Sequence, residues 1–379
     1  MRRFFPMAAA LTAVIASLLV PSFLAPAQAS ASHPKPQLAN WTPNLTIPTA
    51  RKAKVWRSPW VTTRPSTALL PSWNVTRMPS GTWLRVHVRV ADGSKTSSWK
   101  AVAEWRYALA GGKRQTFGTQ ADALAYLNTD TIRAKGGKTF DRWQIQVKVM
   151  RKSTAKKAPI VRNVAGVAST YVSKTARTSK TSMTRTVDLP VPAYSQMIHS
   201  GHFPQYGGGG EAWCSPTSTA MVLRYWGMGP QAKHYPWAPG ADPWVDHAAR
   251  FSYDSSYRGT GTWPFNTAYA SLFGADAVVH RLVNLRAMEE YIKKGVPVVA
   301  SVAFARGQLT GSPISSTPGH LMVVRGFTSG GDVIVNDPAG RSNSAVRRTY
   351  KREQFERAWL GGSGGVAYVI APRAKRLVF

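Results

Sequence analysis

Cys214 is the only cysteine in this chain of 379 residues, and its sequence setting favours a reactive thiol. Four glycines, 207–210, precede it, and a helix is indicated after it by Pro216 in the first turn and Gly227 as a stop signal. The N–H groups and dipole at a helix start favour the thiolate, which is the nucleophilic form of cysteine. A lone cysteine can also be a small buried apolar residue. The helix start, together with the secretory N-terminus described below, favours a nucleophile.

A cysteine nucleophile requires a base, usually histidine, whose second ring nitrogen is held by an orienting group. Among the eight histidines, His320 stands at the start of an apolar strand that follows a Gly/Ser/Pro-rich loop. The next strand ends at Asn336 and Asp337, and an antiparallel pair joined by a turn at 329–331 would return Asp337 beside His320. We therefore expect Asp337 to orient His320, with Asn336 as the alternative. Each motif alone is also an ordinary strand start or turn.

Gln196 is the fourth candidate, because its amide and the backbone N–H of Cys214 could both donate to a developing oxyanion. These residues together predict acyl transfer: His320 takes the Cys214 proton, the thiolate attacks an amide carbonyl, and water hydrolyses the thioester. We expect no cofactor. Zinc could be bound by His199 and His202 with His234 or His247. The single cysteine and the lack of tight spacing to acidic residues favour no metal.

The motifs that carry these residues also follow one another in a characteristic order. They are Val191-Pro192-Ala193-Tyr194-Ser195-Gln196, Trp213-Cys214-Ser215-Pro216-Thr217-Ser218, Gly319-His320-Leu321 and Val335-Asn336-Asp337-Pro338. Residues 188–379 thereby resemble the papain-like cysteine peptidases related to the bacterial enzymes that cleave double-glycine leader peptides in bacteriocin processing. The resemblance implies that Gln196 is the oxyanion-hole residue, Cys214 the nucleophile, His320 the general base and Asp337 the orienting residue. Ser215 stands where many relatives have glycine.

The N-terminus has the pattern of a signal peptide. Basic residues at 2–3 precede an apolar run over 7–24, and small residues at 27–29 suit cleavage. We expect a signal peptide at 1–29 and a mature protein that is secreted and extracellular or cell-wall associated. No later stretch is long and apolar enough to span a bilayer, so we expect no integral membrane segment after signal removal. We expect a monomer.

Positive charge is concentrated in the front half of the chain. Residues 30–187 hold 28 Lys and Arg against 5 Asp and Glu, a net of +23, whereas residues 188–379 hold 19 against 12, a net of +7. Such a surface attracts polyanions, and anionic cell-wall polymers are the partner that we expect for it. No nucleic-acid-binding motif is present, so specific nucleic-acid binding is not expected. The alternative is that a secreted protein simply tolerates this charge.

The domain organisation follows from composition and periodicity. Residues 30–54 are rich in Pro, Thr and Ala and suggest a flexible leader, and residues 173–186 suggest a Ser/Thr/Lys-rich linker. Between them, residues 55–172 contain period-two strands such as 83–90, which indicate an antiparallel sandwich. Its seven tryptophans favour core packing over a sugar-binding platform. Helices followed by strands make residues 187–379 an α+β domain.

The sequence thus predicts an α+β papain-like catalytic domain preceded by an all-β antiparallel sandwich domain. The expected activity is that of a secreted cysteine peptidase acting on peptides or proteins, with cell-wall peptides as one target. A peptidoglycan amidase or transpeptidase would use the same residues. A non-catalytic wall-binding protein with a papain-like scaffold is the third alternative, and it gives no reason to retain Gln196, Cys214, His320 and Asp337 together.

Overall fold

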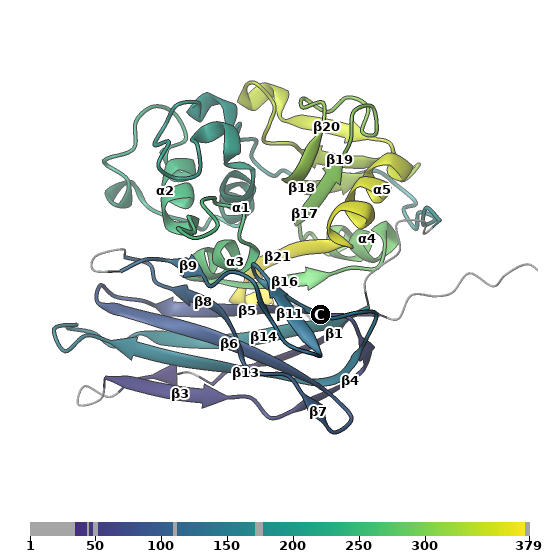
Figure 1. The fold of residues 1–379 in the computed structure, drawn as a ribbon. Helices are drawn as coiled ribbons and strands as arrows, with labels where there is room; N and C mark the ends of the chain where they lie inside the picture. Colours follow the sequence, from purple (N-terminus) through teal and green to yellow (C-terminus); the bar gives the residue numbers. More distant parts are fainter. Residues whose placement is uncertain (1–34, 44, 48–51, 109–111, 171–176, 376–379) are drawn as a thin grey trace, which may run out of the picture. The chain divides into compact units, whose positions relative to one another are not determined.

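Two antiparallel sheets form the front half of the computed structural model, which describes residues 35–43, 45–47, 52–108, 112–170 and 177–375 (Figure 1). One sheet has the order β1-β14-β5-β12-β11-β10 with β2 beside β14; the other is β3-β13-β6-β8-β9, with β4 beside β13 and β7 beside β6. The strands are β1 (Gln37–Trp41), β2 (Leu45–Thr46), β3 (Ala53–Arg57), β4 (Val61–Ser66), β5 (Ala68–Arg77), β6 (Thr82–Asp92), β7 (Lys95–Thr96), β8 (Lys100–Trp105), β9 (Gln115–Thr116), β10 (Gln120–Ala121), β11 (Ala125–Asn128), β12 (Thr131–Ala134), β13 (Phe140–Arg151) and β14 (Ile160–Ser169).

Period-two alternation determines which face of these strands is buried. In β6, Leu84, Val86 and Val88 are fully buried, whereas Arg85 between them is exposed. Most buried apolar side chains of the two sheets belong to one hydrophobic cluster, whereas Leu70, Ala165 and Val167 pack with residues of the back half. Of the seven tryptophans, three lie fully buried in this cluster, namely Trp73, Trp105 and Trp143. Trp60 is 37% exposed, so the tryptophans do not all serve as core.

Part of the predicted flexible leader is ordered, so that prediction is wrong for these residues. β1 pairs along β14, with Gln37 opposite Ala168 and Trp41 opposite Val164. The Trp41 ring centroid lies 5.6 Å from that of Trp143 in an edge-on contact. Backbone pairing and aromatic packing therefore outweigh the loop-like composition. The predicted signal peptide at 1–29 lies outside the described residues.

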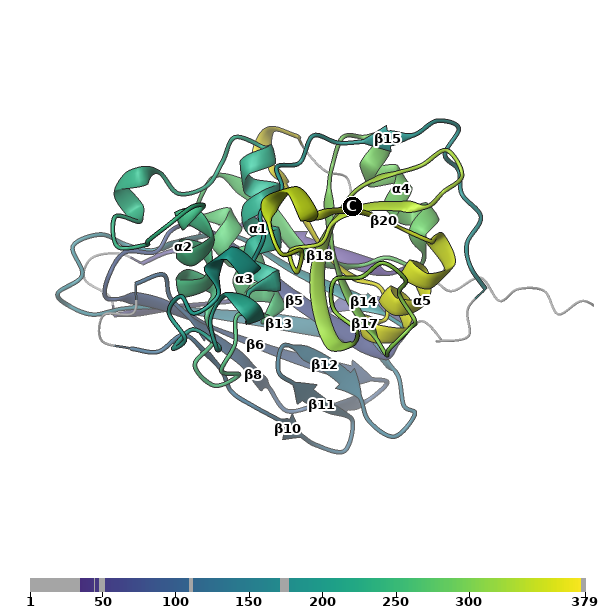
Figure 2. The same cartoon turned by 90° about the horizontal axis from the view of Figure 1, so that it is seen from above.

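A third antiparallel sheet, of order β16-β21-β17-β18-β19-β20 with β15 beside β18, organises the back half. Alternate residues of its central strands enter different clusters: Val298 and Met322 pack with α4 and α5, whereas Val299 and Val323 pack with α1 and α2. Helices therefore cover both faces, and Figure 2 shows α1 beside β18. The elements are β15 (Val187–Asp188), η1 (Met197–His199), η2 (Gly210–Ala212), α1 (Cys214–Tyr225), η3 (Ala232–His234), α2 (Pro243–Ser252), α3 (Trp263–Ser271), β16 (Ala275–Arg281), α4 (Leu285–Lys293), β17 (Val298–Phe304), β18 (Thr317–Phe327), β19 (Val333–Asn336), η4 (Asn343–Ala345), β20 (Arg347–Tyr350), α5 (Arg352–Ser363), β21 (Val366–Pro372) and η5 (Arg373–Lys375).

The described part of the predicted linker, residues 177–186, is attached to the back half. Glu289 is buried and accepts hydrogen bonds from the Thr181 hydroxyl at 2.7 Å and from the Ser182 N–H at 2.7 Å. Arg352 donates to the same carboxylate at 2.6 Å. The Ser/Thr-rich sequence that suggested a linker therefore supplies hydroxyl and N–H donors to a buried carboxylate, which requires such hydrogen bonds.

The two halves contact each other directly within one compact unit. The side chain of Asn74 on β5 bonds both the N–H and the C=O of Ala277 on β16, at 2.8 and 2.9 Å. Phe265 and Ala268 of α3 complete the hydrophobic cluster of the front sheets. None of the helices in the described ranges has the length and hydrophobicity needed to cross a membrane.

Candidate active site

Cys214 is the first residue of α1, as the sequence predicts. Trp213 is fully buried and donates its indole N–H to the Tyr206 carbonyl at 2.8 Å, which fixes the chain immediately before the cysteine. Ser215, at the position where glycine was expected from the resemblance, bonds the Tyr368 hydroxyl at 3.0 Å and so anchors the helix start to β21. The N–H of Ser215 interacts with the Cys214 sulfur. The helix start thus presents N–H groups to the thiol.

His320 lies on β18 and contacts both the cysteine and the aspartate. Its Nε2 is 2.7 Å from Oδ1 of Asp337, and its ring also forms a hydrogen bond with the Cys214 thiol. Asp337 follows β19, which pairs with β18 in antiparallel register, Val323 lying opposite Asn336. The hairpin predicted from the spacing is therefore present. It brings Asp337 beside His320, 17 residues away in the sequence, and His320 in turn contacts Cys214, which lies more than a hundred residues before it.

The pKa values of these groups shift in directions that favour an ion pair. Burial alone would raise the pKa of Cys214, but the hydrogen bond and charge of His320, with the N–H groups of Leu321 and Ser215, outweigh it and lower that pKa. Burial would lower the pKa of His320, yet the Asp337 charge and the bonds to Asp337 and Cys214 raise it to about 10. The geometry thus favours a thiolate beside an imidazolium.

Asp337 is held by two further donors. Tyr350 on β20 donates its hydroxyl to Oδ2 at 2.7 Å, and the Ala339 N–H donates to Oδ1 at 3.1 Å. Burial would raise the pKa of Asp337, but the charge of His320 and these bonds lower it. Tyr350 was not identified from the sequence, because a tyrosine ending a short strand carries no local signal of this contact.

Asn336, the alternative orienting residue, has a different role. Its amide donates to the carbonyls of Val191 and Pro192 at 3.2 and 3.0 Å. It therefore secures the segment that leads to Gln196, and Asp337 is the residue that contacts His320.

Gln196 is buried and lies next to the short helix that precedes Cys214. Its Nε2 donates to the Glu211 carbonyl at 2.6 Å, and its backbone N–H donates to the Pro338 carbonyl at 2.8 Å. One of the two N–H bonds on Nε2 is occupied by the Glu211 bond, which leaves a second donor on the same nitrogen. Gln196 is therefore linked through its side chain to the segment before Cys214 and through its backbone to the residue after Asp337.

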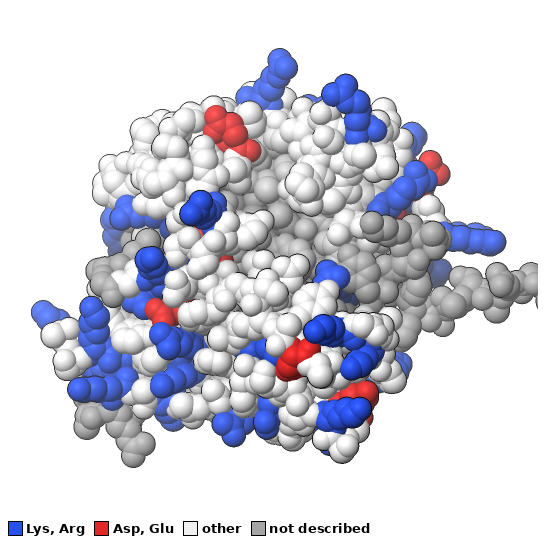
Figure 3. All heavy atoms as spheres, viewed as in Figure 1, with Lys and Arg blue, Asp and Glu red and all other residues white. Residues whose placement is uncertain are grey.

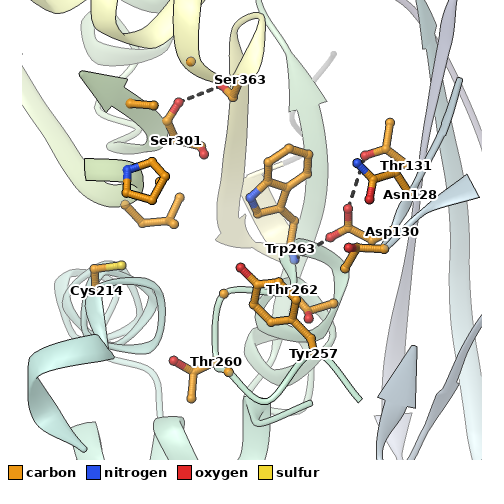
Figure 4. A pocket seen from close by; sticks show the side chains of 18 of the residues that line it. Asn128, Asp130, Thr131, Cys214, Tyr257, Thr260, Thr262, Trp263, Ser301 and Ser363 are labelled. Carbon is orange, nitrogen blue, oxygen red and sulfur yellow. Dashed lines mark hydrogen bonds between the residues drawn. The ribbon is translucent and has the colours of Figure 1, made fainter. Parts of the chain in front are cut away.

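A pocket of about 660 Å³ opens beside Cys214 (Figure 4). Cys214 lies on one side of it and Asp130 on the other, with Trp263 and Tyr257 between them. Ser301 and Ser363 form another part of its wall. Its lining includes residues of the front half, from the turn between β11 and β12, and this contribution was not foreseen from the sequence.

The histidines considered for zinc are only partly brought together. His199 and His202 lie beside Asp246, with ligand atoms of the three residues within 4.8 Å of one another. The Nδ1 atom of each ring is 2.9 Å from a different oxygen of the buried Asp246 carboxylate. His247 instead bonds the Tyr269 hydroxyl at 2.8 Å. Two imidazoles and a carboxylate are a donor set that zinc accepts. His202 forms a hydrogen bond with one oxygen of Asp246, whereas the other oxygen and both ring nitrogens of His199 have no hydrogen-bond partner among the described residues.

The antiparallel α+β back half, with a cysteine at a pocket and a histidine in contact with that cysteine, is the arrangement of a peptidase-like protein. Residues 188–365 match the Peptidase C39 like family, and residues 38–169 match the Peptidase C39 N-terminal domain. The C-terminal half of the chain therefore belongs to the Peptidase C39-like family, and the front half carries the N-terminal domain of C39 peptidases. The resemblance noted in the sequence is confirmed for the C-terminal half.

Among solved structures, the chain is similar to one described as a C39-like peptidase from Bacillus anthracis, with 19% identity, coverage of 50% of this chain and 98% of that chain, and a TM-score of 0.33. It is also similar to the structure of infectious bursal disease virus Gt strain, with 15% identity, coverage of 41% and 36%, and a TM-score of 0.19. Both TM-scores are low, so the assignment depends on the family matches. A search of curated proteins found no match.

Proposed function

We propose that the protein is a secreted cysteine peptidase that hydrolyses peptide or amide bonds through a thioester intermediate. The observation that carries this proposal is the chain of contacts from the Cys214 thiol to His320 and from His320 to Asp337 at 2.7 Å. We further propose that the back half has a papain-like architecture and that the front sheets form a sandwich. The N-terminal signal pattern supports an extracellular or cell-wall location for a monomeric enzyme.

In this mechanism the resting site holds a thiolate and an imidazolium. The thiolate of Cys214 attacks the carbonyl carbon of the scissile amide, and His320 then gives its proton to the leaving amine. Asp337 stabilises the imidazolium and fixes its ring orientation. His320 next takes a proton from water, which attacks the thioester and releases the acid product and the Cys214 thiolate, so that the thiolate and imidazolium of the resting site are restored. In both proton transfers the proton is carried by the same His320 nitrogen, the one that does not contact Asp337.

The oxyanion of each tetrahedral intermediate would be stabilised by two donors. The Cys214 N–H belongs to the first turn of α1, where N–H groups lack acceptors within the helix. The second N–H of Gln196 Nε2 is the other donor. Removal of one such donor costs about 10²–10³-fold in kcat.

Chemical modification and matched variants test the proposal. We expect iodoacetamide to alkylate Cys214 faster than a free thiol near neutral pH, with parallel loss of amide hydrolysis, and Cys214→Ala to be inactive. His320→Ala should slow alkylation and abolish turnover, whereas His234→Ala, at an exposed position, should do neither. Wild-type turnover in His320→Ala would refute the assignment of the base. A thiol no more reactive than free cysteine would favour the non-catalytic scaffold.

The peptidoglycan amidase or transpeptidase alternative shares all four residues, so product analysis must separate it from the peptidase. Incubation with purified wall peptides and with an unrelated peptide library distinguishes the two by mass spectrometry of the products. Products that carry a second amine in place of water would identify a transpeptidase.

A second function, binding of anionic wall polymers, is favoured by a row of stacked side chains on the front half. The Arg89 guanidinium lies 4.7 Å from the Trp60 ring centroid and 4.6 Å from that of Trp99. Arg142 extends the row over Trp60 at 5.6 Å, and Arg57 extends it over Trp99 at 5.3 Å. In Figure 3, Lys and Arg side chains cover much of the front half, whereas few acids are visible. Stacking orders the cations and leaves their charge available to polyanions.

Pull-down on purified cell walls across a salt series tests this second function. We expect binding to weaken as salt rises, and Arg89→Gln to weaken it further at low salt. Arg306→Gln, an equal change of charge at an exposed position of the back half, is the matched control. Binding that is indifferent to salt, or equal loss in both variants, would contradict binding through the Arg/Trp row.

A further inference from the structure

The pocket beside Cys214 is bounded by both halves of the protein. The front half contributes the turn between β11 and β12, residues 128–131, together with Arg133. The back half contributes the loop 257–263 and small residues that leave the space open, among them Ser301 and Gly362. A pocket of about 660 Å³ is large enough for amino-acid side chains. Because Cys214 lines the pocket, a side chain bound there lies beside the thiol.

Backbone strain is present at two residues of the pocket lining, one from each half. Thr129 has φ 54° and Arg258 has φ 57°, and both line the pocket. Positive φ is unfavourable for residues with a Cβ, and it is especially unusual for a β-branched threonine. Such strain costs about 1–3 kcal/mol and persists where surrounding contacts fix the backbone, as they commonly do at ligand sites.

Two buried carboxylates attach the pocket-lining segments of one half to the other half. Asp130 of the front half accepts the Trp263 N–H at 2.9 Å at the start of α3. Asp254 of the back half accepts the Thr116 N–H and hydroxyl at 3.1 and 2.8 Å, and it also accepts the Tyr257 N–H at 3.2 Å. The loop that carries Arg258 is therefore attached to the front half as well as to its own.

The pocket lining carries more positive than negative charge. Its charged lining residues other than Cys214 are Asp130, Arg133 and Arg258. Asp130 is buried and both of its oxygens accept hydrogen bonds, from Trp263 and from the Thr131 hydroxyl. Burial raises the pKa of Asp130 to about 6, so its charge is weakened further in mildly acid solution. Arg258 is exposed, and within the described ranges its guanidinium forms no ion pair.

We propose that this pocket is a substrate subsite built jointly by the two halves, and that it takes a carboxylate-bearing side chain on the carbonyl side of the bond to be cut. Arg258 supplies the charge that recognises the carboxylate, and Asn128 adds an amide donor from the front half. The inference rests on the proposed function, because it assigns the substrate class of the same site. It makes the front half part of substrate recognition, in addition to any binding of wall polymers.

Peptidyl chloromethyl ketones test the subsite without requiring turnover. The thiolate of Cys214 displaces chloride from such a probe and forms a thioether, which intact mass reports. Probes are made in pairs that differ only by Glu or Gln at the first, second or third residue before the ketone. We expect the Glu probe of one pair to react about tenfold faster than its Gln partner, equivalent to about 1.4 kcal/mol.

Variants on each wall then separate the two contributions. Arg258→Gln should bring the Glu/Gln rate ratio close to one, and Asn128→Asp, which adds a negative charge at the front wall without a change of shape, should lower it several-fold. Arg286→Gln removes an equal charge from an exposed position on α4 and should leave the ratio unchanged. Iodoacetamide rates and thermal unfolding, measured on each variant, verify that the thiol and the fold are intact.

The outcomes distinguish this proposal from the proposed function. A Glu/Gln ratio of one in the wild type, or a ratio unaffected by Arg258→Gln, overturns the acidic subsite, and fast iodoacetamide alkylation then leaves the peptidase proposal in place. A ratio that responds to Arg258→Gln but not to Asn128→Asp overturns the contribution of the front half. A thiol that reacts slowly with every probe and with iodoacetamide overturns both proposals.

Discussion

Asp337→Asn removes the buried charge at one end of the catalytic array while preserving its shape. The carboxylate contacts His320 at 2.7 Å, Tyr350 at 2.7 Å and the Ala339 N–H at 3.1 Å. A hydrogen bond to a charged group contributes about 1.5–3 kcal/mol, and one pKa unit corresponds to about 1.4 kcal/mol. Loss of the bond to His320 should therefore lower the pKa of His320 by about 1–2 units. The pKa of Cys214 should rise, because the imidazolium that lowers it is less populated.

The assay is the rate of iodoacetamide alkylation as a function of pH, combined with kcat/KM for an amide substrate. In the variant, the midpoint of alkylation should move to higher pH, and kcat/KM should fall by about 10²–10⁴-fold, the usual contribution of a positioned acid or base. Asp332→Asn is the matched control, because Asp332 contacts the Lys351 ammonium at 2.9 Å on the same hairpin and does not contact His320. An alkylation midpoint equal to that of wild type in a folded Asp337→Asn protein would refute the electrostatic reasoning.

Three further predictions follow from other contacts. The kcat/KM profile should rise with pH through the lowered pKa of Cys214 and fall only near pH 10, where His320 loses its proton; an alkaline limb near pH 6.5, the ordinary value for histidine, would contradict the ion pair. Glu289→Ala should destabilise the fold by about 3–5 kcal/mol in denaturant unfolding, because Arg352 loses its buried partner, whereas Glu290→Ala at an exposed position should have little effect. Dialysis against EDTA should leave activity and melting temperature unchanged, because none of the proposed catalytic residues belongs to the group of His199, His202 and Asp246, and His202 already forms a hydrogen bond with the Asp246 carboxylate; a metal content near one per chain, with loss of melting temperature on chelation, would identify a zinc site.

The sequence correctly predicted those elements that are determined by residues within the element itself. The alternation of β6 and the proline and glycine around α1 depend on one segment at a time, and both elements formed at the expected positions. The His320–Asp337 contact was also predictable, because a hairpin relates residue spacing to distance.

Elements that depend on distant partners were not predicted. β16 has a short mixed sequence and is defined by its pairing with β21, in which Ala275 lies opposite Pro372. β1 is fixed by β14, and residues 177–186 are fixed by Glu289 and by Arg352. The sequences of β1 and of residues 177–186 resemble that of a loop and β16 has no clear alternation, so in each case tertiary contacts outweigh local propensity.

The contacts between the halves predict that the front half affects catalysis, although it has its own hydrophobic core. Arg114 is fully buried and donates to the carbonyls of Arg250 and Tyr253 at 3.1 Å, which ties the front half to α2 and to the start of the loop that leads to the pocket. Asp254 follows immediately and binds Thr116. A buried guanidinium or carboxylate without a partner raises the free energy of the folded protein. Separating the halves would remove the partners that Arg114 and Asp254 have in the opposite half and so destabilise the pocket wall. The same groups that stabilise the interface therefore position the loop that carries Arg258, and changes on the front side of this interface should alter reactivity at Cys214.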